Sequence, residues 1–375
     1  MAPDVSLAAA PQRRVFAHFP GHLALVIVAI CAIGLWNLAS AARTASAGGS
    51  VWVSQMAWMG FGIVVALAAA LIDNRAFQRL AWVFYGLVVL LLVAVLLKGR
   101  YVMGARRWIT FGSVNFQPSE LAKLAVALAL ARWFAADAEK RKDGYGLLGL
   151  VIPLGITLVP AVLILKQPDL GTGLIVVAIG CTMILFARVR WKTLAILGGV
   201  AIGGAVFVYP HLKPYQKRRV ETFFNPDADT QGAGYHARQS MIAVGSGQGL
   251  GKGWGQGTQN NLSFLPEQHT DFIFSVWAEE HGFVGCLLLL ALYFTLVAAS
   301  IDIAGNARDR FGHFLAVGIT AMLFWHVFIN IGMVIGVLPV VGVTLPLMSY
   351  GGSSVVAIFG ALGMLANVGM RRFVN

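Results

Sequence analysis

Three ionisable side chains stand at alternate positions just before a long apolar run. The segment FLPEQHTDFIF carries Glu267, His269 and Asp271. In an extended chain, alternate side chains point to one face, so all three would meet one ligand. A carboxylate at the edge of a membrane is a candidate general base, and the E-x-H-x-D spacing is also a weak signal for a divalent cation, Mg²⁺ or Mn²⁺, at Asp271. The alternative is a local role, in which Thr270 caps a helix that begins at Asp271.

A second set of charged and aromatic residues leads into another apolar run. Arg106 and Arg107 are suited to hold phosphate oxygens, and Trp108 to lie at the headgroup level of a bilayer. Glu120 lies one turn before Lys123 on the same helix face, and such a pair is costly in an apolar helix unless it meets a partner or a water-filled cavity. The alternatives are an aromatic belt with flanking arginines and a mutually satisfied interfacial pair.

Three further candidates lie in two other segments. Lys166 and Asp169 belong to KQPDLGTG, where Asp169 falls just inside a helix start, so that capping is a rival role. Lys166 either snorkels outward or points into the same cavity as Lys123. Ser349 opens the run SYGGSS before the last apolar segment, which suits anion binding and is also an ordinary helix start.

The composition indicates an integral membrane protein. Of the 375 residues, 58% are hydrophobic and 12% are charged, and the mean hydropathy is +0.75. A soluble domain would not tolerate so apolar a surface, and a helix needs about 20 apolar residues to cross the bilayer. We therefore predict an all-α integral membrane protein, a polytopic bundle of ten transmembrane helices at residues 23–41, 52–72, 79–97, 119–136, 146–165, 170–187, 192–209, 282–302, 313–337 and 350–370.

The predicted organisation is a single transmembrane domain over residues 1–375, with one large external loop at 210–271 between helices seven and eight. This loop is too long to be a simple connector, so we expect it to fold over the outer face of the bundle. It contains an amphipathic piece at 235–244 and a glycine-rich run at 245–257. The run lacks the GK[ST] ending of a P-loop, which argues against nucleotide binding.

Glycine and proline give two further expectations for the spans. Pro153 and Pro160 predict a kinked or broken fifth span, because proline removes a helix donor. Gly199 and Gly203, four residues apart in the seventh span, predict close helix packing.

The distribution of basic residues predicts the topology. Most short loops rich in Lys and Arg fall on one side, which places both termini in the cytoplasm of a multi-pass protein of the cytoplasmic membrane. The candidate site then lies on the outer side. The net charge of +12 follows from this placement and from attraction to anionic lipid, and it does not imply nucleic acid binding.

In combination, these segments resemble the SEDS family of bacterial cell-wall polymerases (shape, elongation, division and sporulation), and its RodA branch more closely than FtsW. The resemblance covers almost the whole chain from the second span onward. It is carried by GARRW at 104–108, QPSELAKL at 117–124, KQPDLGTG at 166–173, GAGYHARQS at 232–240, GKGWGQGTQ at 251–259, FLPEQHTDFIF at 264–274, and the signature from Asn330 through PVVGVTLPLMSYGGSS.

The resemblance implies a peptidoglycan glycosyltransferase that polymerises lipid II into glycan strands at the outer face of the membrane during cell elongation. The acceptor GlcNAc 4-hydroxyl would attack C1 of the donor MurNAc and displace undecaprenyl pyrophosphate. Asp271 matches the family's essential aspartate and is assigned as the general base. The expected substrate-binding residues are Arg106, Arg107, Trp108, Glu120, Lys123, Lys166, Asp169, Glu267, His269 and Ser349.

The resemblance also implies partners. A class B penicillin-binding protein, the elongation-type transpeptidase of the penicillin-binding protein 2 class, is expected, together with other elongation-complex proteins and membrane lipid. No cofactor is required by the resemblance, and the divalent cation stays an open alternative. Two other functions compete, namely a lipid II flippase or transporter that uses the same cavity and charges, and a non-catalytic scaffold of the wall-synthesis complex.

Overall fold

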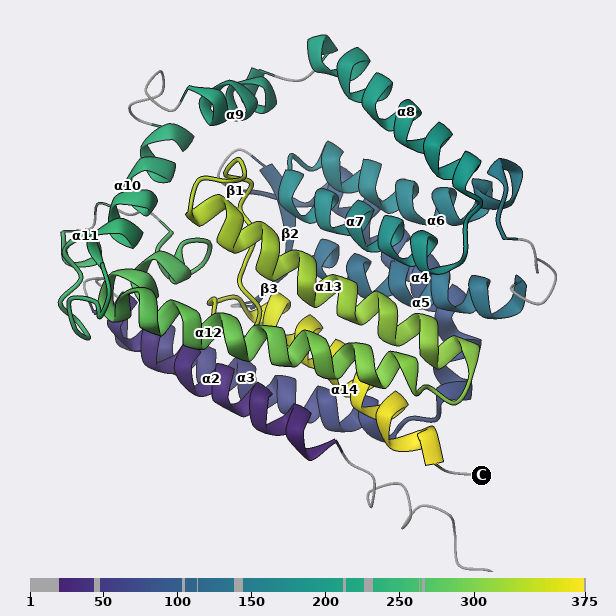
Figure 1. Ribbon diagram of the computed structural model, residues 1–375, viewed down its shortest axis with the longest axis horizontal. Coiled ribbons are helices and arrows are strands. Elements are labelled where there is room, and N and C mark those ends of the chain that lie inside the picture. Colours follow the sequence, from purple (N-terminus) through teal and green to yellow (C-terminus); the bar gives the residue numbers. More distant parts are fainter. Residues whose placement is uncertain are drawn as a thin grey trace, which may run out of the picture.

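The protein is a bundle of long helices, seen in a computed structural model that describes residues 20–43, 48–102, 105–112, 114–137, 144–211, 214–225, 232–262, 264 and 267–373 (Figure 1). The long helices are α2 (Gly21–Ala41), α3 (Gly48–Leu71), α4 (Asn74–Lys98), α5 (Pro118–Asp137), α6 (Leu147–Lys166), α7 (Leu170–Phe186), α8 (Trp191–Val208), α12 (Ile273–Gly305), α13 (Arg310–Val334) and α14 (Gly352–Met370).

Within these described ranges, seven helices are long and apolar enough to cross a membrane, namely α2, α3, α4, α6, α12, α13 and α14. Helix α7 and most of α8 are apolar but shorter. The prediction of an all-helical, multi-pass membrane protein is confirmed, whereas the count of ten spans stays a prediction.

The interior of the bundle is formed around α13 and α5. Helix α13 packs against α5, α7 and α12, and α14 packs against α3. Small residues permit the close approach of α5 and α13, since a Cβ added to Gly318 would lie 2.9 Å from the Cβ of Ala127.

The two prolines of α6 do not interrupt the helix, which runs unbroken from Leu147 to Lys166. Pro160 has no N–H to donate to the carbonyl of Ile156, four residues earlier. The hydroxyl of Tyr85, on α4, donates to that carbonyl instead, at 3.0 Å. The freed acceptor is therefore satisfied by a neighbouring helix, and the predicted break of the fifth span does not occur.

Helix α8 lies apart from the other long helices at the edge of the molecule (Figure 1). A Cβ added to Gly199 or Gly203 would meet no atom within 4 Å. The prediction that these glycines allow close helix packing is therefore wrong within this single chain.

One end of the bundle carries a small antiparallel sheet that the sequence analysis did not predict. Its strands are β1 (Arg100–Val102), β2 (Ala105–Phe111) and β3 (Val114–Phe116), in the order β1-β2-β3. The described parts of the predicted external loop form η3 (Tyr209–His211), α9 (Pro214–Phe224), α10 (Ala233–Ser246) and α11 (Thr258–Asn261). Helix α10 includes the predicted amphipathic piece at 235–244. These elements lie at the end of the molecule opposite to the C-terminus (Figure 1).

Replacing Tyr85 with Phe should destabilise the protein by about 1 kcal/mol, because the Ile156 carbonyl would lose its hydrogen bond inside the bundle. The apparent midpoint of thermal unfolding in detergent measures this effect. The control is Tyr209→Phe, which alters an exposed tyrosine in η3. Equal midpoints for the two variants would contradict the account of α6.

Candidate functional site

The candidate site is built on a tight turn that precedes α12. The N–H groups of Thr270, Asp271 and Phe272 all donate to the carbonyl of Glu267, at 3.1 to 3.3 Å, and Glu267 has a φ of 51°. Residues 267–272 are therefore not extended, so the condition under which the three side chains would share one face is not met. Thr270 does not cap a helix at Asp271 either, because α12 begins at Ile273 and the Thr270 hydroxyl contacts the Glu267 carboxylate at 3.2 Å.

The amide of Asn330 fixes the backbone of Asp271. Asn330 is fully buried near the end of α13, and its Nδ2 donates to the carbonyl of Asp271 at 2.8 Å and to that of Val343 at 2.6 Å. One side chain therefore joins α13 to both the turn and the loop between α13 and α14. The role of Asn330 was not predicted from the sequence, since its partners are distant along the chain.

Ser349 and Tyr350 hold the preceding residues of the same turn. The Ser349 hydroxyl donates to the carbonyl of Thr270 at 2.6 Å and accepts from the N–H of Leu345 at 2.7 Å. The N–H of Tyr350 donates to the carbonyl of His269 at 2.9 Å, and the two rings lie edge to face. In this structure Ser349 positions the turn, and His269 packs against Tyr350.

The carboxylate of Asp271 is in an environment that favours its neutral form. The pKa of Asp271 is raised to about 7, mainly by burial and also by the negative charges of Glu267 and Asp169, while the positive charges of Arg219 and Arg107 lower it. These four charged groups therefore lie within electrostatic range of Asp271. A carboxylate with such a pKa can accept a proton near neutral pH.

A glycine makes room for this carboxylate. Gly342 has a φ of 73°, and a Cβ at that position would lie 3.0 Å from Oδ2 of Asp271. Any larger residue would be strained and would press on the carboxylate.

Asp169 serves as the cap of α7, the role that rivalled substrate binding. Its Oδ1 accepts from the N–H of Thr172 at 3.3 Å. Its Oδ2 accepts from Nε2 of Gln117 at 3.0 Å and from the hydroxyl of Ser119 at 3.4 Å. The buried carboxylate thus ties the start of α7 to the start of α5.

The predicted cations separate into different environments. Arg107, on β2, is half-buried and donates to the carbonyls of Gln167 and Pro168, which places it at the loop between α6 and α7. Arg106 and Trp108 flank it in the strand, whose pairing with β1 is irregular at this point. Arg106 and Lys166 are exposed, and Trp108 is half-buried.

Lys123 lies inside the bundle in a cluster with two partners. Its Nζ is 2.8 Å from Oε2 of Glu120 and 2.8 Å from Nε2 of His326. Nδ1 of His326 contacts the carbonyl of Met322 at 2.7 Å, so Nδ1 is the donor and Nε2 accepts from Lys123. Lys123 is therefore buried and paired, whereas Lys166 is exposed. His326 escaped the sequence analysis, although an imidazole in an apolar helix is itself a signal.

The possible cation site at Asp271 finds no ligand set in the described part of the chain. No three His, Cys, Asp or Glu side chains there come together in a way that could hold a metal ion. We derive no catalytic step through a metal.

Replacing Asn330 with Ala should destabilise the protein by about 2 to 4 kcal/mol, because two buried carbonyls would lose their donor. It should also speed hydrogen–deuterium exchange at residues 267–272. Asn367→Ala is the matched control, since Asn367 is a buried amide that donates to carbonyls at the end of α3, far from the turn. That variant should lose stability and keep slow exchange in the turn. Unchanged exchange at 267–272 in the Asn330 variant would refute the role of Asn330 in holding this turn.

Known proteins share this sequence and fold. The family of cell cycle proteins that comprises FtsW, RodA and SpoVE matches residues 20–373. The peptidoglycan glycosyltransferase MrdB of Escherichia coli K12 is 40% identical over 321 residues, which cover 84% of each chain. The probable peptidoglycan glycosyltransferase FtsW of Neisseria gonorrhoeae is 35% identical over 391 residues, covering 93% of this chain and 84% of the relative.

Two solved structures are similar over 95% of this chain. A chain from a peptidoglycan synthase complex that coordinates polymerization and crosslinking has a TM-score of 0.82 and 34% identity, with 99% of that chain covered. The rod shape determining protein RodA of Thermus thermophilus has a TM-score of 0.71 and 30% identity, with 98% of it covered. The chain therefore belongs to the FtsW, RodA and SpoVE family, the SEDS proteins.

Proposed function

We propose that this protein is a peptidoglycan glycosyltransferase of the elongation type, which polymerises lipid II into glycan strands. The observation that carries the proposal is the environment of Asp271. Its carboxylate has a pKa of about 7, which Arg107 and Arg219 are close enough to influence, and Asn330 holds its backbone carbonyl. The relatives' names, peptidoglycan glycosyltransferase MrdB and FtsW, support the same reaction class.

In the proposed reaction, Asp271 acts as the general base. The 4-hydroxyl of the acceptor GlcNAc attacks C1 of the donor MurNAc, and the Asp271 carboxylate accepts the hydroxyl proton. The new C1–O bond forms as the bond from C1 to the pyrophosphate oxygen breaks. Undecaprenyl pyrophosphate leaves with the bonding electron pair.

The departing pyrophosphate gains negative charge, which nearby cations stabilise. Arg107 and Arg219 are the first candidates, because both lower the pKa of Asp271 and so lie near the reacting atoms. The exposed Arg106 and Lys166 are placed to guide the anionic substrate, and Trp108 to line its path. Lys123 has a different role in this account, since Glu120 and His326 already pair it within the bundle.

The proposed setting is the cytoplasmic membrane, with both termini inside and the Asp271 turn at the outer face. The placement of the turn at the end opposite to the C-terminus supports this orientation (Figure 1). The proposed partner is a class B penicillin-binding protein of the elongation complex. The similar chain from a complex that couples polymerization to crosslinking supports that pairing.

Replacing Asp271 with Asn should reduce polymerisation of purified lipid II by about 100- to 10,000-fold, because the amide cannot accept the proton. The assay is run with the partner present and with matched protein amounts. Asp302→Asn is the control, since Asp302 is a carboxylate on the same helix that pairs with Arg372 at the other end.

Normal polymer length and rate in the Asp271 variant would refute the catalytic assignment. Polymer made by the partner alone would instead favour a scaffold. Movement of lipid II across liposomes without any polymer would favour a transporter.

The rate of polymerisation should rise with pH through a midpoint near 7, because only the ionised Asp271 is a base and its pKa is raised to about 7. Glu267→Gln removes a charge that raises this pKa, so the midpoint should move to lower pH. Arg219→Gln removes a charge that lowers it, so the midpoint should move to higher pH. Initial rates between pH 5 and pH 9 measure both shifts, and equal midpoints in all three proteins would contradict the assigned base.

A further inference from the structure

Helix α12 is broken at Gly282, where the backbone has φ 63° and ψ −161°. In a continuous helix the N–H groups of Phe283 and Val284 would donate to the carbonyls of Glu279 and Glu280. The break leaves these two donors and two acceptors without helical partners. Buried backbone groups of this kind are costly unless something else pairs with them.

The backbone of the glycine-rich run at 245–257 supplies hydrogen-bond partners for these four groups. Phe283 and Val284 donate to the carbonyls of Gln248 and Gly249, at 2.8 and 3.1 Å. In return, the N–H groups of Lys252 and Gly253 donate to the carbonyls of Glu279 and Glu280, each at 3.0 Å. Four hydrogen bonds thus replace the two that the helix loses.

This fit explains why the segment is rich in glycine. A Cβ on Gly247 would lie 2.1 Å from the carbonyl oxygen of Ala278, and one on Gly251 would lie 2.2 Å from that of Glu280. Gly251 also has a φ of 82°, which favours glycine. The close approach expected of such a run is therefore to a helix of the same chain.

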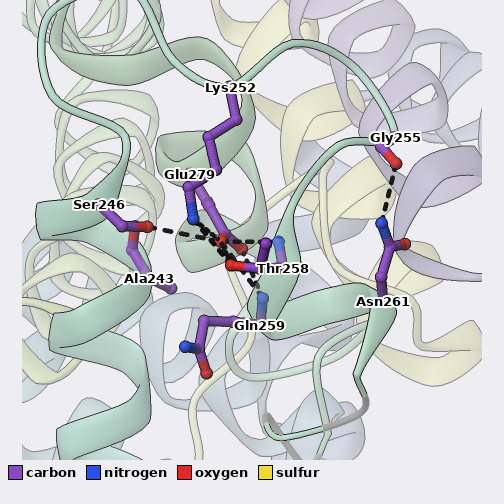
Figure 2. Close-up of polar contacts among 8 residues, drawn as sticks. All are labelled: Ala243, Ser246, Lys252, Gly255, Thr258, Gln259, Asn261 and Glu279. Atoms are coloured by element: carbon purple, nitrogen blue, oxygen red, sulfur yellow. Dashed lines mark hydrogen bonds and ion pairs between the residues drawn. The ribbon is translucent and has the colours of Figure 1, made fainter.

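The carboxylate of Glu279 holds this segment in place (Figure 2). Glu279 is fully buried and accepts from several donors of the segment and its flanks. These donors are Nζ of Lys252 at 2.6 Å, the N–H and hydroxyl of Thr258 at 2.9 and 3.0 Å, the N–H of Gln259 at 3.2 Å and the hydroxyl of Ser246 at 3.4 Å. A buried carboxylate with this many donors forms strong, charge-assisted bonds.

A short buried helix connects Glu279 to the Asp271 turn. All residues from Phe272 to Glu280 are buried. Nδ2 of Asn37, on α2, donates to the carbonyl of Ile273 at 2.9 Å, so this piece is also fixed at its start. Because the piece is a packed helix, a shift at Glu279 is transmitted to the turn two helical turns away.

We propose that Glu279 is a positioning residue, which locks residues 247–259 into the break of α12 and thereby sets the place of Asp271. This inference rests on the proposed function, and it assigns to the glycine-rich segment a mechanical role in the reaction. Residues 247–259 stabilise the break in α12. The part of α12 before the break follows directly on the turn that carries the general base, Asp271.

Glu279→Gln tests the proposal, because the amide nitrogen would face the N–H of Gln259 in either orientation and the negative charge that pairs with Lys252 would be lost. We expect faster hydrogen–deuterium exchange both at 247–259 and at 267–273. We also expect kcat for lipid II to fall by about 10- to 100-fold with KM nearly unchanged, as for a misplaced catalytic group. Asp302→Asn is the matched control and should change neither exchange nor kcat.

Lys252→Met is a milder variant, which removes one donor and leaves the backbone donors to Glu279 in place. It should change exchange and kcat in the same direction by a smaller factor, and it keeps the test valid if the Glu279 variant does not fold. Faster exchange at 247–259 with wild-type exchange at 267–273 and wild-type kcat would overturn the proposal. The exchange measurement needs no catalysis, so it separates failure of this inference from failure of Asp271 as the base.

Discussion

The position of Asp271 depends on the two hydrogen bonds that the buried amide of Asn330 donates, at 2.8 Å to Asp271 and at 2.6 Å to Val343. Both acceptors are backbone carbonyls, so the bonds fix the chain and leave the Asp271 carboxylate unengaged by them. Ser349 supplies a similar bond to Thr270 one residue earlier. A general base must be held in place while its oxygens stay available for a proton, and a turn clamped through its carbonyls meets both needs.

The membrane imposes a second constraint on the fold, since unpaired backbone groups are not tolerated in hydrocarbon. Two irregularities of the helices are satisfied by a neighbouring element. Tyr85 donates a hydrogen bond to the carbonyl freed by Pro160 in α6, and the glycine-rich segment forms hydrogen bonds with the four backbone groups freed at Gly282 in α12. The buried Lys123 likewise meets Glu120 and His326. These buried groups are therefore paired within the chain, and Asp271 lies on the turn that precedes α12.

Hydropathy predicted the positions of the long helices well because apolar length is a local property. Hydropathy predicted that the eighth span begins at 282, whereas α12 begins at Ile273 and is broken at Gly282. The part before Gly282 contains Glu279 and Glu280, so its sequence is typical of a polar loop. The roles of Asn330 and Glu279 were missed because their partners lie far along the chain. His326 gave a local signal, an imidazole in an apolar helix, but its partner Lys123 is distant as well. The strands around Arg107 pair with their neighbours in sequence, and they were missed because they are short. Residue types and spacing marked Asp271 as one of three candidates, and the resemblance to a family motif selected it, while the hydrogen bonds that hold its backbone became visible only in three dimensions.

The central claim is that Asp271 receives the proton of the attacking hydroxyl, and a structure with substrate tests it most directly. Cryo-electron microscopy of the Asp271→Asn variant, with its partner and two lipid II molecules bound, would locate the acceptor sugar. The account predicts the GlcNAc 4-hydroxyl within about 3 Å of the residue 271 side chain, with the donor pyrophosphate on the side of Arg107 and Arg219. An acceptor hydroxyl beyond hydrogen-bond reach of residue 271 and against another carboxylate, such as Glu267, would contradict it.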